Sequence, residues 1–400
     1  MANLVHQKSV KAKISRFPAL SLGVAAMLVT LNAPAQPSLA ITRSGNHAVL
    51  SWPNTASNCV LQSTTNLAAP SWLAMSNVVP VIVNTNYTVP VTNTARAVFF
   101  RLYYTNAAVV PAGMLLIPAG SFTIGDMLDG NSDAIPANVY LSAFHMDPNP
   151  VSYGQWQAVY NWATNHGYDF ADPGAGKTTN HPVDTVNWYD CLKWCNARSE
   201  MEGLTPAYYT NVAQTAVYRS GQYYGAFLVN ADVKWHAGYR LPTEAEWEKA
   251  ARGGSTGLRF PWGNTISESQ ADYMGCDYCY TNYDAGPDSY NALGMVGGSP
   301  YTTPIGSFAA NNYGLHDMAG NVWEWCWDLY EPPSYPDGSP YLGGTDPLGP
   351  DYGMDLRVMR GGSWFRDAYS ARCAYRNFDT PTWPGGYPAR EYGFRCVVGY

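Results

Sequence analysis

The chain has 400 residues and a formal net charge of −7, with 13% charged and 14% aromatic residues. This length suits two or three domains, and no run of Lys or Arg has the pattern of a nucleic-acid-binding surface, which excludes that class of function. The 37 Gly and 29 Pro predict many turns, with loops packed by Tyr and Trp rings. Eight Cys are too few for a cystine-rich scaffold, so a hydrophobic core must stabilise the fold.

Residues 1–35 have the pattern of a secretory signal peptide, in which a basic segment precedes a short apolar run and a small-residue cleavage site. The apolar run covers 19–31, and an Ala-Pro-Ala site places the expected cleavage near Ala35. The alternative is a membrane anchor, but the run is shorter than the roughly 20 residues that span a bilayer. We therefore expect export to the periplasm, the cell surface or the medium, where disulfides can form. The basic residues are Lys8, Lys11, Lys13 and Arg16.

Residues 36–106 are predicted to form a small antiparallel β-sandwich, similar to fibronectin or immunoglobulin domains. Short β-branched and aromatic runs alternate there with Asn-, Pro- and Thr-rich turns. No catalytic set of residues occurs among them, so a spacer or adhesive role is expected. The predicted strands cover 48–52, 59–64, 79–85 and 97–104.

A second unit, 113–400, begins with a strand, a Pro-Ala-Gly turn and another strand over 114–126. Ser152 with Gln155, and Thr243 with Glu246, have the form of helix-capping boxes, and Asn187 is the expected cap of a third helix. Gly, Pro, Tyr and Asn dominate after these helices, which predicts a loop-rich α+β domain. The predicted helices cover 153–163, 188–203 and 244–252.

Six stretches of this unit, in this order, closely resemble the formylglycine-generating enzyme family, also called sulfatase-modifying factors. They include "RLPTEAEWEKAARGG", "YGLHDMAGNVWEWCWD" and "RVMRGGSW". The resemblance covers about 113–400 and implies a variant of the C-type-lectin-like α+β fold. The six stretches are 114–126, 240–254, 259–263, 313–328, 357–364 and 393–397.

Active members of this family use copper and O₂ to convert a sulfatase cysteine into formylglycine. Two thiolates on neighbouring backbone hold the copper, because soft sulfur ligands select Cu(I). In those enzymes both cysteines follow the Gly-Gly-Ser-aromatic turn, but the first position here is Arg366 and the second is missing from a shortened interval. Cys373 lies in the later segment, which supplies a structural half-cystine in relatives. The resemblance therefore implies a pseudoenzyme for which copper is not expected.

The expected binding pocket contains Trp323, Ser363, Trp364 and Arg366 with nearby Tyr-rich loops. Aromatic rings on loops suit an extended polypeptide, such as a sulfatase segment, or a glycan. The alternative is an active formylglycine-generating oxidase with rearranged thiols, using Cys373 as a weak catalytic candidate together with Cys326. A purely structural cell-surface module is a third reading that rests on the β-sandwich alone.

The resemblance also implies calcium. The positions that match the family's ion-binding loop are Asp317, Gly320, Val322 and Glu324. Two carboxylates and two backbone carbonyls suit this hard cation, whereas the alternative is a helix-capping Asp and a solvated Glu. A second family site would begin at Asp272 and Tyr273, but its later acidic ligand has no clear counterpart.

The family's cysteine pattern implies a disulfide between Cys195 and Cys396. The partner that the family provides for Cys373 would be at position 251, which is Ala251 here, so that thiol pairs elsewhere or stays free. Cys276 and Cys279 form a C-x-x-C sequence that favours a loop disulfide, because no helix N-terminus is predicted there to activate a thiol and no nearby His completes a zinc site. The residues whose pairing stays open are Cys59, Cys191, Cys276, Cys279, Cys326 and Cys373.

Overall fold

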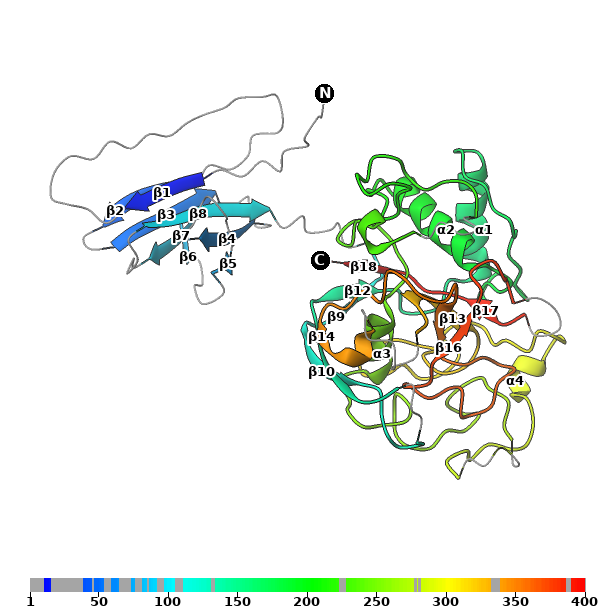
Figure 1. Ribbon diagram of the computed structural model, residues 1–400. Coiled ribbons are helices and arrows are strands. Elements are labelled where there is room, and N and C mark those ends of the chain that lie inside the picture. The colour runs from blue at the N-terminus through cyan, green and yellow to red at the C-terminus, as the bar shows by residue number, and fades with distance from the viewer. Residues whose placement is uncertain are drawn as a thin grey trace. The chain divides into compact units, whose positions relative to one another are not determined.

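The structure is a computed structural model, and the chain divides into two compact units, Met1–Ala107 and Ala108–Tyr400 (Figure 1). In the part of the chain that it describes, no helix is long and apolar enough to cross a bilayer. Most of the predicted signal peptide lies outside the described residues. The described residues are 11–15, 39–44, 47–53, 59–64, 73–75, 81–84, 86–91, 97–104, 111–130, 134–222, 228–276, 279, 282–331, 339–385 and 390–399.

The first unit contains two four-stranded sheets, ordered β1-β8-β4-β5 and β2-β3-β7-β6. Both contribute to one core, in which Leu50, Trp52 and Val89 come from one sheet and Leu61 and Phe100 from the other. The four predicted strands are confirmed as β3, β4, β6 and β8. The strands are β1 (Lys11–Ser15), β2 (Ala40–Ser44), β3 (His47–Pro53), β4 (Cys59–Thr64), β5 (Leu73–Ala74), β6 (Val81–Val83), β7 (Asn86–Val91) and β8 (Ala97–Tyr104).

Strand β1 falls inside the predicted signal peptide, where no strand was expected. It pairs antiparallel with β8, Lys11 opposite Arg101 and Ser15 opposite Ala97. Its sequence, Lys-Ala-Lys-Ile-Ser, alternates polar and apolar residues, and lysines are common in edge strands. Export and cleavage remain predictions.

The second unit contains the three predicted helices, and their capping residues are confirmed. Ser152 and Thr243 each make a complete capping box, and the Asn187 side chain accepts a hydrogen bond from the backbone N–H of Asp190. Gly253 ends its helix in the left-handed conformation, at φ 56°. The helices are α1 (Tyr153–Thr164), α2 (Trp188–Met201), α3 (Glu244–Arg252) and a short α4 (Ala292–Met295).

Short strands of this unit form three small sheets, ordered β18-β12-β9, β10-β11-β14 and β16-β15-β13-β17. Long connections without regular structure join them, so the predicted loop-rich α+β class is confirmed (Figure 1). The strands are β9 (Leu115–Ile117), β10 (Gly120–Ile124), β11 (Ala137–Leu141), β12 (Phe144–Met146), β13 (Trp323–Leu329), β14 (Gly344–Thr345), β15 (Arg357–Arg360), β16 (Asn377–Asp379), β17 (Tyr392–Gly393) and β18 (Val397–Gly399); single 3₁₀ turns lie at Asn230–Asp232 and Pro340–Leu342.

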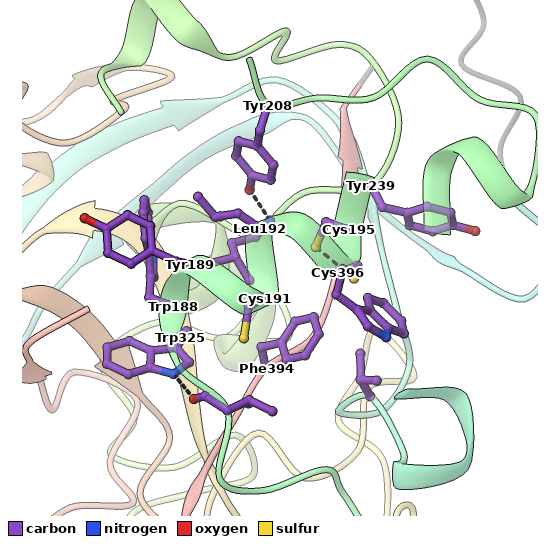
Figure 2. Close-up of a cluster of buried hydrophobic side chains, with 14 of the residues drawn as sticks. Trp188, Tyr189, Cys191, Leu192, Cys195, Tyr208, Tyr239, Trp325, Phe394 and Cys396 are labelled. Atoms are coloured by element: carbon purple, nitrogen blue, oxygen red, sulfur yellow. Dashed lines mark hydrogen bonds between the residues drawn. The ribbon is translucent and has the colours of Figure 1, made fainter. Parts of the chain in front are cut away.

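Aromatic rings fill the core between α1 and α2. Trp156 and Trp194 stack in parallel with ring centroids 5.9 Å apart, and Phe394 packs edge-on against both. In the same cluster the indole of Trp325 donates a hydrogen bond to the carbonyl of Val186 at 2.9 Å (Figure 2). Large aromatic side chains therefore fill much of this core, and rings such as that of Trp325 satisfy their own polar atoms through hydrogen bonds. This accounts for the high Trp and Tyr content of the sequence.

A network of buried ion pairs joins α3 to the strands behind it. Glu244 pairs with Arg376 at 2.7 Å and with Arg360 at 3.3 Å, while Glu248 accepts a short hydrogen bond from Arg360. All four side chains are at most 1% exposed. Loss of one partner would leave an uncompensated charge in the core, so the network fixes the end of β15 relative to α3.

Two cysteine pairs come together in the second unit. Cys276 and Cys279 form a disulfide, which confirms the loop bridge expected from the C-x-x-C sequence. Cys195 on α2 and Cys396 before β18 lie in the aromatic core with their sulfur atoms 3.6 Å apart and unbonded (Figure 2). A covalent bond requires about 2.05 Å, so the disulfide between them remains a prediction.

In protein purified under oxidising conditions we expect Cys195 and Cys396 to be bonded, because both thiols are buried and already in contact. The bond would close a loop with a sequence separation of 201 residues, for which the chain-entropy model gives about 5 kcal/mol. Non-reducing peptide mapping checks this. A free thiol at either position in folded, oxidised protein would refute the pairing.

Candidate functional site

The Gly-Gly-Ser-Trp turn follows β15 directly and depends on backbone that only glycine adopts easily. Gly361 and Gly362 have φ of 98° and 76°, and a Cβ at Gly362 would lie 3.1 Å from the backbone of Ala371. The backbone N–H of Trp364 donates to the carbonyl of Asn321 at 2.9 Å. The turn is therefore held against the loop that precedes β13.

Three polar side chains form a connected group on this turn. The Ser363 hydroxyl donates a short hydrogen bond to Glu391 Oε2, and Arg366 meets the same carboxylate at two points, Nη2–Oε1 at 2.6 Å and Nε–Oε2 at 3.1 Å. Glu391 is buried, whereas the Arg366 side chain is 44% exposed. The guanidinium is therefore oriented by a buried carboxylate while part of it faces solvent.

Aromatic rings surround this group, and we call Tyr290, Tyr301, Trp364 and Phe365 the aromatic rim. The Trp364 ring lies 5.3 Å from Tyr301, 5.7 Å from Tyr290 and 5.2 Å from Phe365. Trp364 is buried, and the other three rings are partly exposed. Arg366 lies 5.9 Å from the centroid of the Phe365 ring, so a partly exposed cation stands beside the partly exposed rings of the rim.

Trp323, which was expected to line the pocket, lies beneath this surface. It is 1% exposed and packs on Tyr375 with centroids 5.9 Å apart, and no described residue accepts a hydrogen bond from its indole N–H. Its backbone N–H donates to the carbonyl of Glu391 at 2.7 Å. Trp323 thus supports Glu391 rather than offering a face of its own.

The loop that carries the disulfide borders the site. The backbone N–H of Met274 donates to the carbonyl of Arg366 at 2.9 Å, and the N–H of Gly275 donates to the carbonyl of Ser289 at 2.8 Å. The N–H of Cys276 donates to Asp284 at 3.2 Å. These bonds attach the segment before Tyr290, a member of the aromatic rim, to the backbone of Arg366.

The thiols considered for catalysis lie in the core. Cys326 and Cys373 are both fully buried and belong to the same apolar cluster as Ala251. Burial raises the pKa of Cys373 to about 12, although the Arg252 cation opposes the shift, and burial also raises the pKa of Cys326. Because the thiolate is the reactive and metal-binding form, neither side chain is prepared for that chemistry.

Of the residues expected to hold calcium, Glu324 is engaged by protein groups. Arg395 binds it at two points of 2.7 Å each, and the Trp247 indole donates to it at 2.8 Å. Gly320 has φ of 82° and passes so close to Asp272 that a Cβ would meet the Asp272 carbonyl, and Val322 is buried just before β13. Glu324 therefore serves chiefly as the partner of a buried arginine.

Asp317 and Asp272 present oxygens that accept no hydrogen bond. Asp317 Oδ2 accepts from the N–H of Gly306 at 2.8 Å, but within the described part of the chain Oδ1 and both carboxylate oxygens of Asp272 make no hydrogen bond of standard geometry. The side-chain oxygens of Thr303 and Asn321 are likewise buried and unpartnered. Burial raises the pKa of Asp317 to about 6 and that of Asp272 well above its usual value, and the Asp317 charge raises the latter further.

These oxygens come from residues of both expected calcium sites, and the backbone joins them, because the N–H of Asn321 donates to the carbonyl of Asp272 at 2.7 Å. Carboxylate, amide and hydroxyl oxygens are the ligands that Ca²⁺ prefers, so this donor set fits the ion. Tyr273, by contrast, uses its hydroxyl to bond Asp284. Among the described residues no group of three or more His, Cys, Asp or Glu side chains is arranged to hold a metal.

The second unit of the chain is similar to known proteins of one family. A family profile described as "Sulfatase-modifying factor enzyme 1-like domain" matches residues 100–399. The formylglycine-generating enzyme of Streptomyces coelicolor is 33% identical over 306 residues, which cover 71% of this chain and 88% of the enzyme. The serine/threonine-protein kinase Pkn1 of Chlamydia trachomatis is 31% identical over 285 residues, 71% of this chain but 38% of the kinase.

The solved structure of Treponema denticola variable protein 1 is similar to this chain, with a TM-score of 0.50 and 29% identity. The similarity covers 72% of this chain and 95% of that protein.

Proposed function

This chain belongs to the sulfatase-modifying factor family, and we propose that it is an exported, non-catalytic member that binds a polypeptide segment at Arg366 and the aromatic rim. The observation that carries the proposal is the ion pair between Arg366 and buried Glu391. It stands at the position where the family resemblance expects the first copper-binding cysteine. The C-type-lectin-like form of the fold is part of the same proposal.

The alternative, an oxidase with rearranged thiols, would have to use Cys326 and Cys373. Formation of a thiolate at either position would place a negative charge in a buried apolar cluster. The free-energy cost of this burial raises the pKa of both thiols. The chemistry would further require access for a substrate cysteine and for O₂, and both thiols are fully buried.

A polypeptide suits the exposed surface of the site. Arg366 uses Nε and Nη2 to hold Glu391, and a guanidinium has five N–H donors, so others remain for an acidic side chain or a backbone carbonyl. Phe365 and Tyr290 lie beside it with stacked rings 6.2 Å apart, and such rings pack against apolar or proline side chains. A glycan would use the same rings, so it is the second outcome to be tested.

We also propose that Asp317 and Asp272, with the oxygens of Asn321 and Thr303, hold a structural Ca²⁺. Among the described residues, five buried oxygen atoms of this set make no hydrogen bond of standard geometry, and an unpartnered buried polar group destabilises a fold. The bound ion would satisfy these oxygens and keep both carboxylates ionised. Its role would be to fasten the loop before β13 to the loop at Asp272.

In calcium-free protein the free energy of unfolding should fall between about pH 4 and pH 6. The folded-state pKa of Asp317 is about 6 and the unfolded value about 3.9, so the folded state binds more protons in this window and loses stability as pH rises. The full loss, about 3 kcal/mol, applies above pH 6. Added Ca²⁺ should restore stability at pH 7 and raise the Tm.

Asp317→Asn should abolish the response to Ca²⁺ and remove the loss between about pH 4 and pH 6 that is due to Asp317, leaving only the loss due to Asp272, whose pKa is also raised. Asp288→Asn, at an exposed position, should change neither. Urea titrations with EGTA or Ca²⁺ measure both effects. Glu324→Ala is unsuitable, because it would strand Arg395 in the core. If EGTA and Ca²⁺ give the same Tm in the unaltered protein, the calcium proposal fails.

The copper-loaded protein should not convert a Cys-x-Pro-x-Arg peptide to the aldehyde, because no accessible thiol pair is present at the turn. Arg366→Cys should be equally inactive, since one thiolate cannot supply the two-sulfur geometry that Cu(I) needs. Mass spectrometry of the peptide after incubation with O₂ measures the conversion. Turnover by the unaltered protein would establish the oxidase and overturn the non-catalytic proposal.

The binding activity is tested on peptide and glycan arrays with matched variants. Phe365→Ala should lose the captured ligands, while Phe378→Ala, which removes a ring that is 41% exposed on β16, should retain them. Capture of peptides by the protein and not by Phe365→Ala supports the proposal. Capture of glycans alone would replace the polypeptide with a carbohydrate ligand.

A further inference from the structure

A cavity of about 140 Å³ lies away from the Arg366 site, between the turn that joins β9 to β10 and the C-terminal end of α3. This volume is roughly ten times the volume that one water molecule needs, so the cavity can hold a small organic molecule. Its lining combines apolar side chains, hydroxyl groups and two cations. The lining residues are Pro118, Ala119, Gly120, Ser121, Phe122, Lys249, Arg252, Gly254, Ser255, Thr256 and Tyr313.

The two cations of the cavity differ in how they are neutralised. Arg252 forms a salt bridge with Glu248 at 2.7 Å and donates to the carbonyls of Gly125 and Leu258. Lys249 is 5% exposed, and its ammonium donates to the carbonyl of Gly120 at 2.9 Å. Among the described residues no carboxylate forms an ion pair with it.

A buried ammonium without a counter-ion is costly, because burial removes its hydration and a single carbonyl replaces little of it. Burial accordingly lowers the pKa of Lys249, opposed by the more distant charge of Asp346. The ammonium has three donors, and only the bond to Gly120 is made by the described protein. An anion in the adjoining cavity would neutralise the charge and accept from the remaining N–H groups.

The walls favour an anion that carries an apolar part. Phe122 and Tyr313 are partly exposed rings, and Pro118 and Ala119 add aliphatic surface. A Cβ at Gly254 would come within 3.2 Å of the Tyr313 hydroxyl, and Gly254 has φ of 81°, so glycine both permits the turn and leaves that hydroxyl accessible. The polar end of a ligand would lie at Lys249 and its apolar part against the rings.

From this arrangement we propose that the cavity is a binding site for a small carboxylate with an apolar body of a few carbons, with Lys249 as its counter-ion. The site shares no residue with the Arg366 site or with the proposed calcium ligands. It is therefore independent of the function proposed above.

The test titrates the full-length protein with sodium benzoate, acetate and sulfate at constant ionic strength and pH 7, with calorimetry and melting temperature as readouts. Benzoate should bind saturably and more tightly than acetate, because only benzoate uses the rings. Lys249→Met should weaken benzoate at least tenfold, and Tyr313→Ala should weaken it about two- to fivefold, because it removes one of the rings that pack against the apolar part.

Lys234→Met is the matched control, because Lys234 is also partly buried, donates to the Tyr209 hydroxyl and lies outside the cavity. It should leave benzoate binding unchanged. In buffer without carboxylate, Lys249→Met should melt at or above the temperature of the unaltered protein, since the uncompensated charge is gone. Equal benzoate affinity in Lys249→Met and the unaltered protein, or a saturable response to sulfate alone, would overturn the assignment.

Discussion

Buried pairing between arginine and glutamate is the constraint on which the second unit depends. Glu244 and Glu248 on α3 hold Arg360 and Arg376, and Glu324 on β13 holds Arg395. These bonds connect helix α3 and strands β13 and β15 with each other and with the connections that carry Arg376 and Arg395, which lie far apart in the sequence. Such pairs add less to stability than their number suggests, because desolvation offsets the attraction. Their geometry nevertheless fixes one arrangement of the loops, since breaking any pair would strand a charge in the core.

This ion-pair network fixes the position of the surface formed by Arg366 and the aromatic rim. Arg360 is the last residue of β15, and the Gly361–Trp364 turn begins directly after it. Glu391, which is buried directly before β17, orients Ser363 of that turn and Arg366 just after it. A positive guanidinium held by a carboxylate repels a metal cation, whereas a thiolate pair would attract one. We propose that Arg366, at the position where the family resemblance expects a copper-binding cysteine, makes this surface a recognition site and not a catalytic one.

Sequence patterns predicted the features that depend on neighbouring residues. The caps at Ser152, Asn187 and Thr243 are hydrogen bonds between residues close in the sequence. The first residue of each helix can therefore be predicted from a short sequence motif. Glu391 as the partner of Arg366 was missed, because 25 residues separate them and nothing local marks the pairing. Glu324 was expected to bind calcium, but its pairing with Arg395, 71 residues away, is equally invisible in a local pattern. The oxygens at Thr303 and Asn321 became candidates only when folding left them buried without partners.

We propose that none of the described thiols is reactive at the surface formed by Arg366. Alkylation of the native protein with iodoacetamide at pH 8, followed by peptide mass spectrometry, tests it most directly. The account predicts that Cys326 and Cys373 stay unlabelled while the protein is folded and react fully once it is unfolded in urea. Rapid labelling of Cys373 in the native protein would contradict the non-catalytic proposal, because it would show an accessible thiolate close to the Gly361–Trp364 turn.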